Sequence, residues 1–357
     1  MSPRATGTRS YQRTGSHVRL LEPPTREGKG VGVSDSTQPL LKVRDLTITF
    51  GSHRRKLSAV AGISFDIYEG ETLGLVGESG CGKSTTGKAL MRIVEPSSGT
   101  IELEGIELTT KKGKDLRNFR TRMQMIFQDP ISSLNPRRRV KDIVAEPLDC
   151  WKTVEGAERE ALVNDLLSKV GIDPVAYGDR YARQFSGGQC QRISIARSLA
   201  MRPKLLICDE MVSALDVSVQ AQILNLLEDL KAEYGLTLLF IAHDLAVVKN
   251  VSDRVAVMYL GKICEIGPSD TLYESPEHPY TKFLLGAALE ADPDSPIHGD
   301  VLSGEPPSPL NPPSGCRFRT RCPNATDKCA NEEPQLVEIA TGHQVACHYP
   351  LSTLVRK

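Results

Sequence analysis

The stretch GESGCGKS, residues 77–84, fits the pattern G-x-x-x-x-G-K-[ST]. It follows the apolar run ETLGLV (residues 71–76) and opens the segment KSTTGKALMRIV (residues 83–94), an order that predicts a strand, a glycine-rich loop and a helix. Glycines let backbone N–H groups approach phosphate oxygens, and the helix N-terminus adds positive potential. We therefore predict a phosphate-binding loop in which Lys83 reaches the β- and γ-phosphates and the Ser84 hydroxyl ligates Mg²⁺.

Further strands and helices alternate around this loop. Strands are predicted in the apolar segments at residues 40–50, 123–128, 204–210, 237–243 and 254–261. Residues 218–235 have helical spacing, with one apolar face formed by Val219, Ile223, Leu226, Leu227 and Leu230. A second helical stretch, residues 151–172, suits a helical subdomain at about residues 130–200. This alternation predicts an α/β fold of the P-loop NTPase type, with a mostly parallel sheet covered on both sides.

An acidic pair ends the strand KLLICDE, residues 204–210. A nucleotide site built on a phosphate loop also needs a carboxylate on a neighbouring strand to hold the metal. Asp209 suits the Mg²⁺ shell, and Glu210 is placed to orient and deprotonate an attacking water.

A second anion-binding device is predicted in QFSGGQCQRISIARSLA, residues 184–200. Ser186, Gly187 and Gly188 precede a helical pattern, so backbone N–H groups there can also bind phosphate. The spacing between the two glycine loops does not decide whether they meet in one subunit or across two.

Six motifs in order give the chain, over residues 40–290, a resemblance to the ATP-binding subunits of ABC transporters. GESGCGKST resembles their Walker A motif, FSGGQ the signature motif, and LLICDE Walker B. SALD (residues 213–216) resembles the D-loop, Gln128 in IFQDP the Q-loop glutamine, and His243 in IAHD the switch histidine. Met211 replaces the proline that usually follows Walker B, and Cys190 follows the signature in place of a basic residue or glutamine.

The resemblance implies an ABC nucleotide-binding domain, in which an antiparallel β subdomain and a helical subdomain accompany the mostly parallel sheet and a cysteine-rich tail follows. It also implies a site for ATP and Mg²⁺. Its catalytic residues would be Glu210, His243, Gln128 and Lys83, and its Mg²⁺ ligands Ser84, Gln128 and Asp209. In this family two subunits enclose two ATP molecules, each between one Walker A loop and the partner's signature motif. Contacts with nucleotide are expected from Phe50, where the family places an adenine-stacking aromatic, and from Gly77, Glu78, Ser79, Gly80, Cys81, Gly82, Lys83, Ser84, Thr85, Gln128, Ser186, Gly187, Gly188, Gln189, Asp209 and Asp216. Phe50 as a plain core residue is the alternative.

A narrower resemblance is to the oligopeptide/dipeptide importer branch. It rests on the segments SSLNPRRRV (132–140), VSALDVSVQAQILNLL (212–227), VMYLGKICEIG (257–267), HPYTKFLL (278–285) and GEPPSPLNPPSGC (304–316). It implies a motor subunit of a peptide importer, with a second ABC ATPase subunit (a heterodimer by preference, a homodimer as the alternative), two permease subunits and an extracytoplasmic solute-binding protein. The subunit would lie at the cytoplasmic face of the membrane, attached through the permeases. A non-transport ABC ATPase and a metal- or redox-sensing subunit are the competing functions.

The composition of the chain limits the classes of function that are possible. Lys+Arg and Asp+Glu are both 44 in 357 residues, and this balance gives no support to nucleic-acid binding. No apolar run approaches the ~18 residues that span a bilayer, and no signal peptide is expected. Residues 1–38 predict a disordered lead-in, residues 39–290 the ATPase domain, and residues 291–357 a C-terminal extension.

Nine cysteines divide into two groups. Five lie in apparent core segments and are expected to be buried as small apolar residues, namely Cys81, Cys150, Cys190, Cys208 and Cys264. The other four, spaced C-x5-C-x6-C-x17-C, are Cys316, Cys322, Cys329 and Cys347. No pair has the tight spacing that structural zinc favours, whereas a [4Fe–4S] cluster tolerates loop-spaced ligands.

The tail of the resembling family often carries this cysteine pattern, and some members are known or proposed to hold such a cluster. A [4Fe–4S] cluster is therefore the preferred prediction, with zinc and no metal as the alternatives. His343 and His348 are expected at the surface, with substitution of either one as a metal ligand as the alternative.

Overall fold

A computed structural model of the chain describes residues 38–52, 55–289 and 305–354. All but the last residue of the predicted lead-in, and the first 14 residues of the predicted extension (291–304), lie outside these ranges. The described part is built on an eight-stranded sheet in the order β11-β12-β10-β9-β3-β8-β7-β6. Its strands are β3 (Thr72–Val76), β6 (Met123–Ile126), β7 (Leu205–Asp209), β8 (Thr237–Ile241), β9 (Arg254–Tyr259), β10 (Lys262–Pro268), β11 (Val337–Ala340) and β12 (His343–Val345).

The five strands β9, β3, β8, β7 and β6 run parallel, and antiparallel pairs extend the sheet beyond β9 through β10, β12 and β11. Strands β3, β7 and β8 are buried along their whole length. Successive side chains alternate between two cores: Leu205 and Ile207 pack on one face, and Leu206 and Cys208 on the other. Both faces are therefore covered, as the near-continuous apolar runs predict.

One face carries α1 (Lys83–Leu90) and a four-stranded antiparallel sheet ordered β2-β1-β4-β5. Its strands are β1 (Leu41–Ser52), β2 (Arg55–Ile67), β4 (Ser98–Leu103) and β5 (Ile106–Glu107). The short helix α2 (Gly113–Phe119) follows β5. Apolar side chains of β1, β2 and α1 share one core with those of the large sheet.

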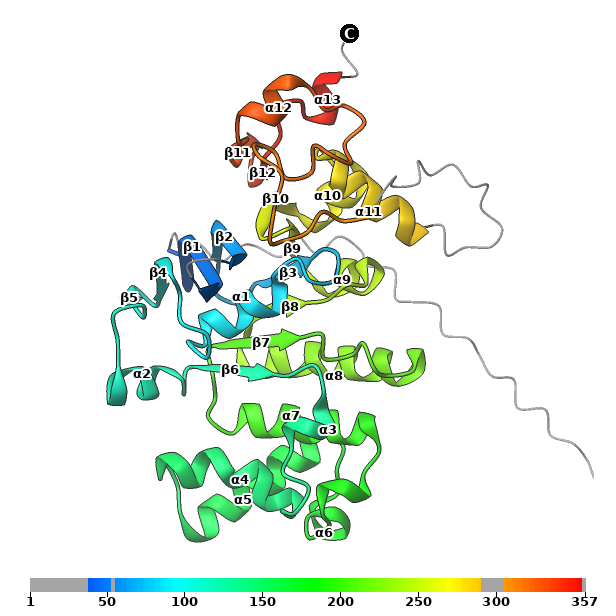
Figure 1. Cartoon of the computed structure of the whole chain (residues 1–357). Helices are drawn as coiled ribbons and strands as arrows, with labels where there is room; N and C mark the ends of the chain where they lie inside the picture. The colour runs from blue at the N-terminus through cyan, green and yellow to red at the C-terminus, as the bar shows by residue number, and fades with distance from the viewer. Residues whose placement is uncertain (1–37, 53–54, 290–304, 355–357) are drawn as a thin grey trace, which may run out of the picture. The chain divides into compact units, whose positions relative to one another are not determined.

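The opposite face is covered by helices. Helix α8 (Val217–Tyr234) buries Ile223, Leu227 and Leu230, three members of its predicted apolar face. Helix α7 (Gly187–Leu199) packs against α3, α4, α5 and α8 and against strand β6. Figure 1 shows the helices of residues 130–199 grouped beyond β6. The remaining helices of this face and its borders are α3 (Pro130–Ser133), α4 (Val140–Trp151), α5 (Gly156–Lys169), α6 (Pro174–Tyr177), η1 (Ala182–Gln184), α9 (Leu245–Val251), α10 (Ser269–Glu274) and α11 (Pro279–Leu289).

The C-terminal tail, residues 305–354, is part of the same folded unit. Strand β12 pairs with β10, matching Glu265 with Val345, so the tail extends the central sheet. Helices α12 (Asp327–Asn331) and α13 (Leu351–Leu354) complete it. In Figure 1 the tail, in orange and red, lies beside α10 and α11. None of the helices in the three described ranges is long and apolar enough to cross a membrane.

The single cysteines mostly follow expectation. Cys81, Cys190, Cys208 and Cys264 are buried, each among apolar side chains. The expectation is wrong for Cys150, which is exposed near the end of α4. The buried apolar face of that helix is formed by five other residues, Val140, Ile143, Val144, Ala145 and Leu148.

Candidate functional site

The loop of residues 77–84 joins β3 to α1 as the sequence predicts. The Lys83 ammonium is buried and donates to the carbonyl oxygens of Gly77 (2.8 Å) and Glu78 (3.1 Å). Gly82 precedes the helix with φ of 111°, in the left-handed region, and a Cβ there would lie 2.2 Å from the carbonyl oxygen of Ala59. A glycine is therefore required for the loop to pass this close to β2.

A hydroxyl and a carboxylate meet beside this loop. The Ser84 hydroxyl, in the first turn of α1, donates to Asp209 Oδ1 at the end of β7 over 2.7 Å. Burial raises the pKa of Asp209, and the Ser84 hydrogen bond and the charges of Lys88 and Lys83 oppose that shift. Two hard oxygen ligands thus lie next to a phosphate loop, the donor set that Mg²⁺ prefers.

Two polar side chains, those of Gln128 and His243, lie beside Glu210, the residue after β7. Gln128 Nε2, beyond the end of β6, donates to Glu210 Oε2 over 2.8 Å. His243 Nδ1, beyond the end of β8, lies 3.8 Å from the same oxygen. These residues follow neighbouring parallel strands, so their side chains meet at the carboxyl edge of the sheet, where α/β folds bind ligands.

The Glu210 backbone is also fixed. Its φ is 47°, in the left-handed region, and its N–H donates to the Ile241 carbonyl over 2.9 Å. Met211, which stands where proline is usual, is 1% exposed and belongs to the core. Side-chain packing of Met211 therefore supports this turn.

The segment at residues 186–189 forms a capped helix start. Ser186 Oγ accepts from the Gln189 N–H (3.3 Å), and Gln189 Oε1 accepts from the Ser186 N–H (3.0 Å), a reciprocal capping box. Gly188 passes close to α8, since a Cβ there would lie 2.6 Å from Val219 Cγ1. Asp216, the exposed N-cap of α8, accepts from the Val219 N–H over 3.0 Å.

The two glycine loops belong to helices on opposite faces of the sheet. Cys190 and Ile193 of α7 pack in one core, and Ala89 and Leu90 of α1 in the other. Ser186 and Gln189 are exposed and bonded to each other. Phe50, on β1, is 41% exposed, so the alternative that it is a core residue is wrong.

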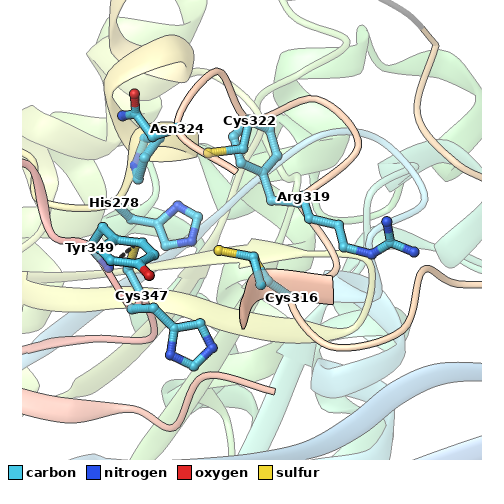
Figure 2. Close-up of a pocket in the computed structure, with 11 residues that line it drawn as sticks. His278, Cys316, Arg319, Cys322, Asn324, Cys347 and Tyr349 are labelled. Carbon is cyan, nitrogen blue, oxygen red and sulfur yellow. Dashed lines mark hydrogen bonds between the residues drawn. The ribbon is translucent and has the colours of Figure 1, made fainter. Parts of the chain in front are cut away.

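The four tail cysteines line a single small pocket, together with His278 and His348 (Figure 2). Burial raises the pKa of Cys322 to about 11 and that of Cys347 to about 12. Within the described residues, no group of three or more His, Cys, Asp or Glu side chains is arranged to hold a metal ion. His343 is not at the surface as expected, because it is 3% exposed and its Nε2 lies 2.8 Å from Glu265 Oε1.

Two residues that the sequence pattern does not identify reach the phosphate loop. The Tyr280 hydroxyl accepts from the Glu78 N–H over 3.0 Å. Arg321, directly before Cys322, forms an ion pair with the Glu78 carboxylate. The contacts join residues 202 and 243 positions apart, and no local motif marks them.

Comparisons with known proteins agree with this geometry. Residues 60–213 match the family described as ABC transporter, and residues 264–329 match the oligopeptide/dipeptide transporter C-terminal region. YkfD of Bacillus subtilis (strain 168) is 51% identical over 314 residues, which cover 87% of this chain and 95% of the relative. The oligopeptide transport ATP-binding protein OppF of Haemophilus influenzae is 48% identical over 327 residues, covering 88% and 98%.

A solved structure of the ATP-binding cassette MJ0796, dimeric and bound to ADP and Pi, is similar with a TM-score of 0.59 and 26% identity. It covers 64% of this chain and 98% of the cassette. The expected fold class and ATPase class are thereby confirmed. The chain belongs to the ATP-binding subunits of ABC transporters, in their oligopeptide/dipeptide branch.

Proposed function

We propose that this chain is the ATP-hydrolysing motor of an importer for peptides or related small solutes. The observation that carries the proposal is the cluster at the carboxyl edge of the sheet, where Glu210 contacts Gln128 and lies close to His243 beside the Ser84–Asp209 pair. Binding and hydrolysis of ATP at this cluster would change the conformation of the permease subunits.

Each residue of the cluster has a proposed role. Lys83 would leave the Gly77 and Glu78 carbonyls to bind the β- and γ-phosphates, a task suited to its buried ammonium. Ser84, Asp209 and Gln128 would hold Mg²⁺, which neutralises developing phosphate charge when bound. Glu210 would accept a proton from the attacking water, and His243 would contact the γ-phosphate. The rest of the loop, Gly77, Glu78, Ser79, Gly80, Cys81, Gly82 and Thr85, would surround the phosphates.

The second half of each ATP site would come from another ATPase subunit. Ser186, Gly187, Gly188 and Gln189 would contact ATP held by the partner, with Asp216 at the interface. Support comes from the exposure of Ser186 and Gln189 and from the separation of α7 and α1 on opposite faces. Phe50, 41% exposed, has a free face for adenine. A heterodimer is preferred over a homodimer.

We further propose peripheral attachment to the cytoplasmic face of a membrane, through two permease subunits served by an extracytoplasmic solute-binding protein. The relative OppF is named for oligopeptide transport, which favours a peptide cargo. Ile131, 60% exposed in the segment DPISSLNP (residues 129–136), offers apolar surface to a permease. The test is co-purification with detergent-solubilised permease subunits, followed by ATP-driven peptide uptake in vesicles. A chain that hydrolyses ATP but associates with no permease contradicts the transport proposal.

For the tail we propose a [4Fe–4S] cluster on Cys316, Cys322, Cys329 and Cys347. All four thiols line one pocket, and thiolates are the ligands such clusters use. A cluster takes one thiolate for each iron, so its ligands surround a cavity without converging on a single point. Iron and zinc content and the visible absorption of anaerobically purified protein test this. Zinc without iron, or no metal, would contradict the cluster.

A further inference from the structure

The side chain of Arg321, in the C-terminal tail, lies against the phosphate-binding loop. Its Nη1 is 2.9 Å from Glu78 Oε2 and 3.1 Å from Oε1, and its Nη2 is 3.1 Å from Oε1. The guanidinium therefore contacts both carboxylate oxygens of Glu78, the second residue of the loop. Two parallel hydrogen bonds of this kind fix the orientation of the carboxylate and also pair its charge.

The ion pair is shielded from solvent on the arginine side. The Arg321 side chain is 6% exposed and that of Glu78 25%. Arg321 Nη1 also donates to the Tyr259 hydroxyl over 3.4 Å, while the Glu78 N–H donates to the Tyr280 hydroxyl. Glu78 is thus held at both its side chain and its backbone by residues outside the loop.

From Glu78 the contacts lead to Lys83. The Glu78 carbonyl accepts from Lys83 Nζ over 3.1 Å. A continuous path therefore runs from the tail arginine, through one loop residue, to the ammonium that we propose binds phosphate. Movement of Glu78 would therefore displace a hydrogen-bond partner of Lys83, and the start of the loop would move with it.

The other end of the path is the cysteine segment itself. Arg321 directly precedes Cys322, and Phe318 stands between Cys316 and Arg321. Phe318 is 1% exposed, and its ring centroid lies 5.3 Å from those of both Tyr259 and Tyr280. The segment of residues 316–322 is therefore anchored in the core between the cysteine pocket and the phosphate loop.

We propose that Arg321 is a positioning residue of the nucleotide site, fixing the start of the phosphate-binding loop through Glu78. On this proposal, the C-terminal tail contributes a residue that supports the ATP site. The proposal rests on the proposed function, since it assumes that the loop binds ATP. Loss of Arg321 should weaken nucleotide binding and raise KM for ATP, with little change in kcat at saturation.

The test measures the affinity of the full chain for a non-hydrolysable ATP analogue with Mg²⁺ by calorimetry. Arg321→Gln and Glu78→Gln should each weaken binding about tenfold, the effect of losing roughly one charged hydrogen-bond pair. The double variant should be no weaker than the weaker single variant, because both changes remove the same contact. Arg321→Lys keeps the charge without the fork and should recover part of the affinity.

The matched control is Arg319→Gln. Arg319 lies in the same segment and bonds Ser314 (2.9 Å to its carbonyl oxygen), and the affinity of this variant should equal that of the wild type. A purely structural role of Arg321 would lower the fraction of active protein and the Tm without changing the Kd of the folded fraction. If Arg321→Gln fails to fold, Glu78→Gln and Arg321→Lys carry the same comparison.

Wild-type Kd in the folded variants, or losses that add in the double variant, would overturn the inference. A wild-type chain that binds no nucleotide would overturn the proposed function and this inference together. Binding by the wild type with unchanged variants would overturn the inference alone.

Discussion

Gly82 illustrates how much of the nucleotide site depends on single backbone positions. Its φ is 111°, and a Cβ at this position would lie only 2.2 Å from the Ala59 carbonyl oxygen, which leaves no room for another residue. The loop can pass this close to β2 only because Gly82 has no side chain. Chemistry at Lys83 and Ser84 therefore depends on a neighbour that contributes no functional group.

Gly82→Ala should destabilise the chain by at least about 3 kcal/mol and abolish nucleotide binding, because backbone must move to relieve the clash. Gly70→Ala is the matched control, with φ of 75° and nothing within 4 Å of its Cβ position. That variant should lose only about 1–2 kcal/mol, the cost of left-handed backbone. Denaturant unfolding measures both, and equal losses would contradict the steric argument.

Glu210→Gln should retain ATP binding and lose at least about 100-fold in turnover, because the amide cannot accept the proton of the attacking water. The control is Glu233→Gln on α8, an exposed carboxylate that pairs with Lys169. Steady-state hydrolysis and nucleotide affinity are measured for both. Undiminished hydrolysis in Glu210→Gln would remove the proposed base.

At the scale of elements, the tail depends on one buried carboxylate of β10. Glu265 has no solvent exposure and accepts from the N–H groups of Glu277 (2.8 Å) and His278 (2.9 Å). His343, at the start of β12, lies 2.8 Å from it as well. One side chain thus ties together β10, the turn before α11 and the tail strand.

Glu265→Ala should cost about 3 kcal/mol or more in the free energy of unfolding, because it leaves the N–H groups of Glu277 and His278 without their acceptor and the buried His343 ring without its polar partner. Glu338→Ala on the exposed strand β11 is the control and should change stability by about 0.5 kcal/mol at most. Limited proteolysis should release the tail faster in the first variant only. Equal digestion of both variants would show that Glu265 does not hold the tail.

The elements themselves were largely predictable, because their signals are local. The buried strands β3, β7 and β8 and the helices α1 and α8 follow from apolar runs and spacing within a few residues. The Glu265–His343 and Arg321–Glu78 contacts could not be predicted, since each joins residues 78 or 243 positions apart and neither has a local pattern. Cys150 was misjudged because five other residues of α4 form its buried face.

For the whole molecule, the junction between ATPase core and tail makes stability depend on pH. His278 is 1% exposed, and burial lowers its pKa to about 4, with the nearby Glu265 charge opposing the shift. Its Nδ1 accepts from the Tyr280 N–H over 3.0 Å, which requires the neutral ring. Protonation therefore favours the unfolded chain, where an ordinary histidine titrates near pH 6.5.

Stability should be full above pH 6.5 and fall by about 3 kcal/mol as the pH drops towards 4, because the unfolded state binds the proton first. His278→Asn keeps an acceptor for the Tyr280 N–H and removes the titration. Its stability should fall less steeply over this range in urea titrations at stepped pH. An unchanged slope would assign the acid sensitivity to other groups.

The pairing of β12 with β10 also limits how the protein can be divided. A fragment ending near residue 289 would leave β10 as the outermost strand of the sheet. The backbone N–H and C=O groups that pair with β12 would then be free to pair with another molecule. The fragment would also lack Phe318, whose ring packs against Tyr259, Tyr280 and Phe283. Such a fragment should associate through this exposed strand edge and should not behave as a minimal ATPase. Shortened forms of the protein that lack the cysteine region should therefore aggregate when expressed.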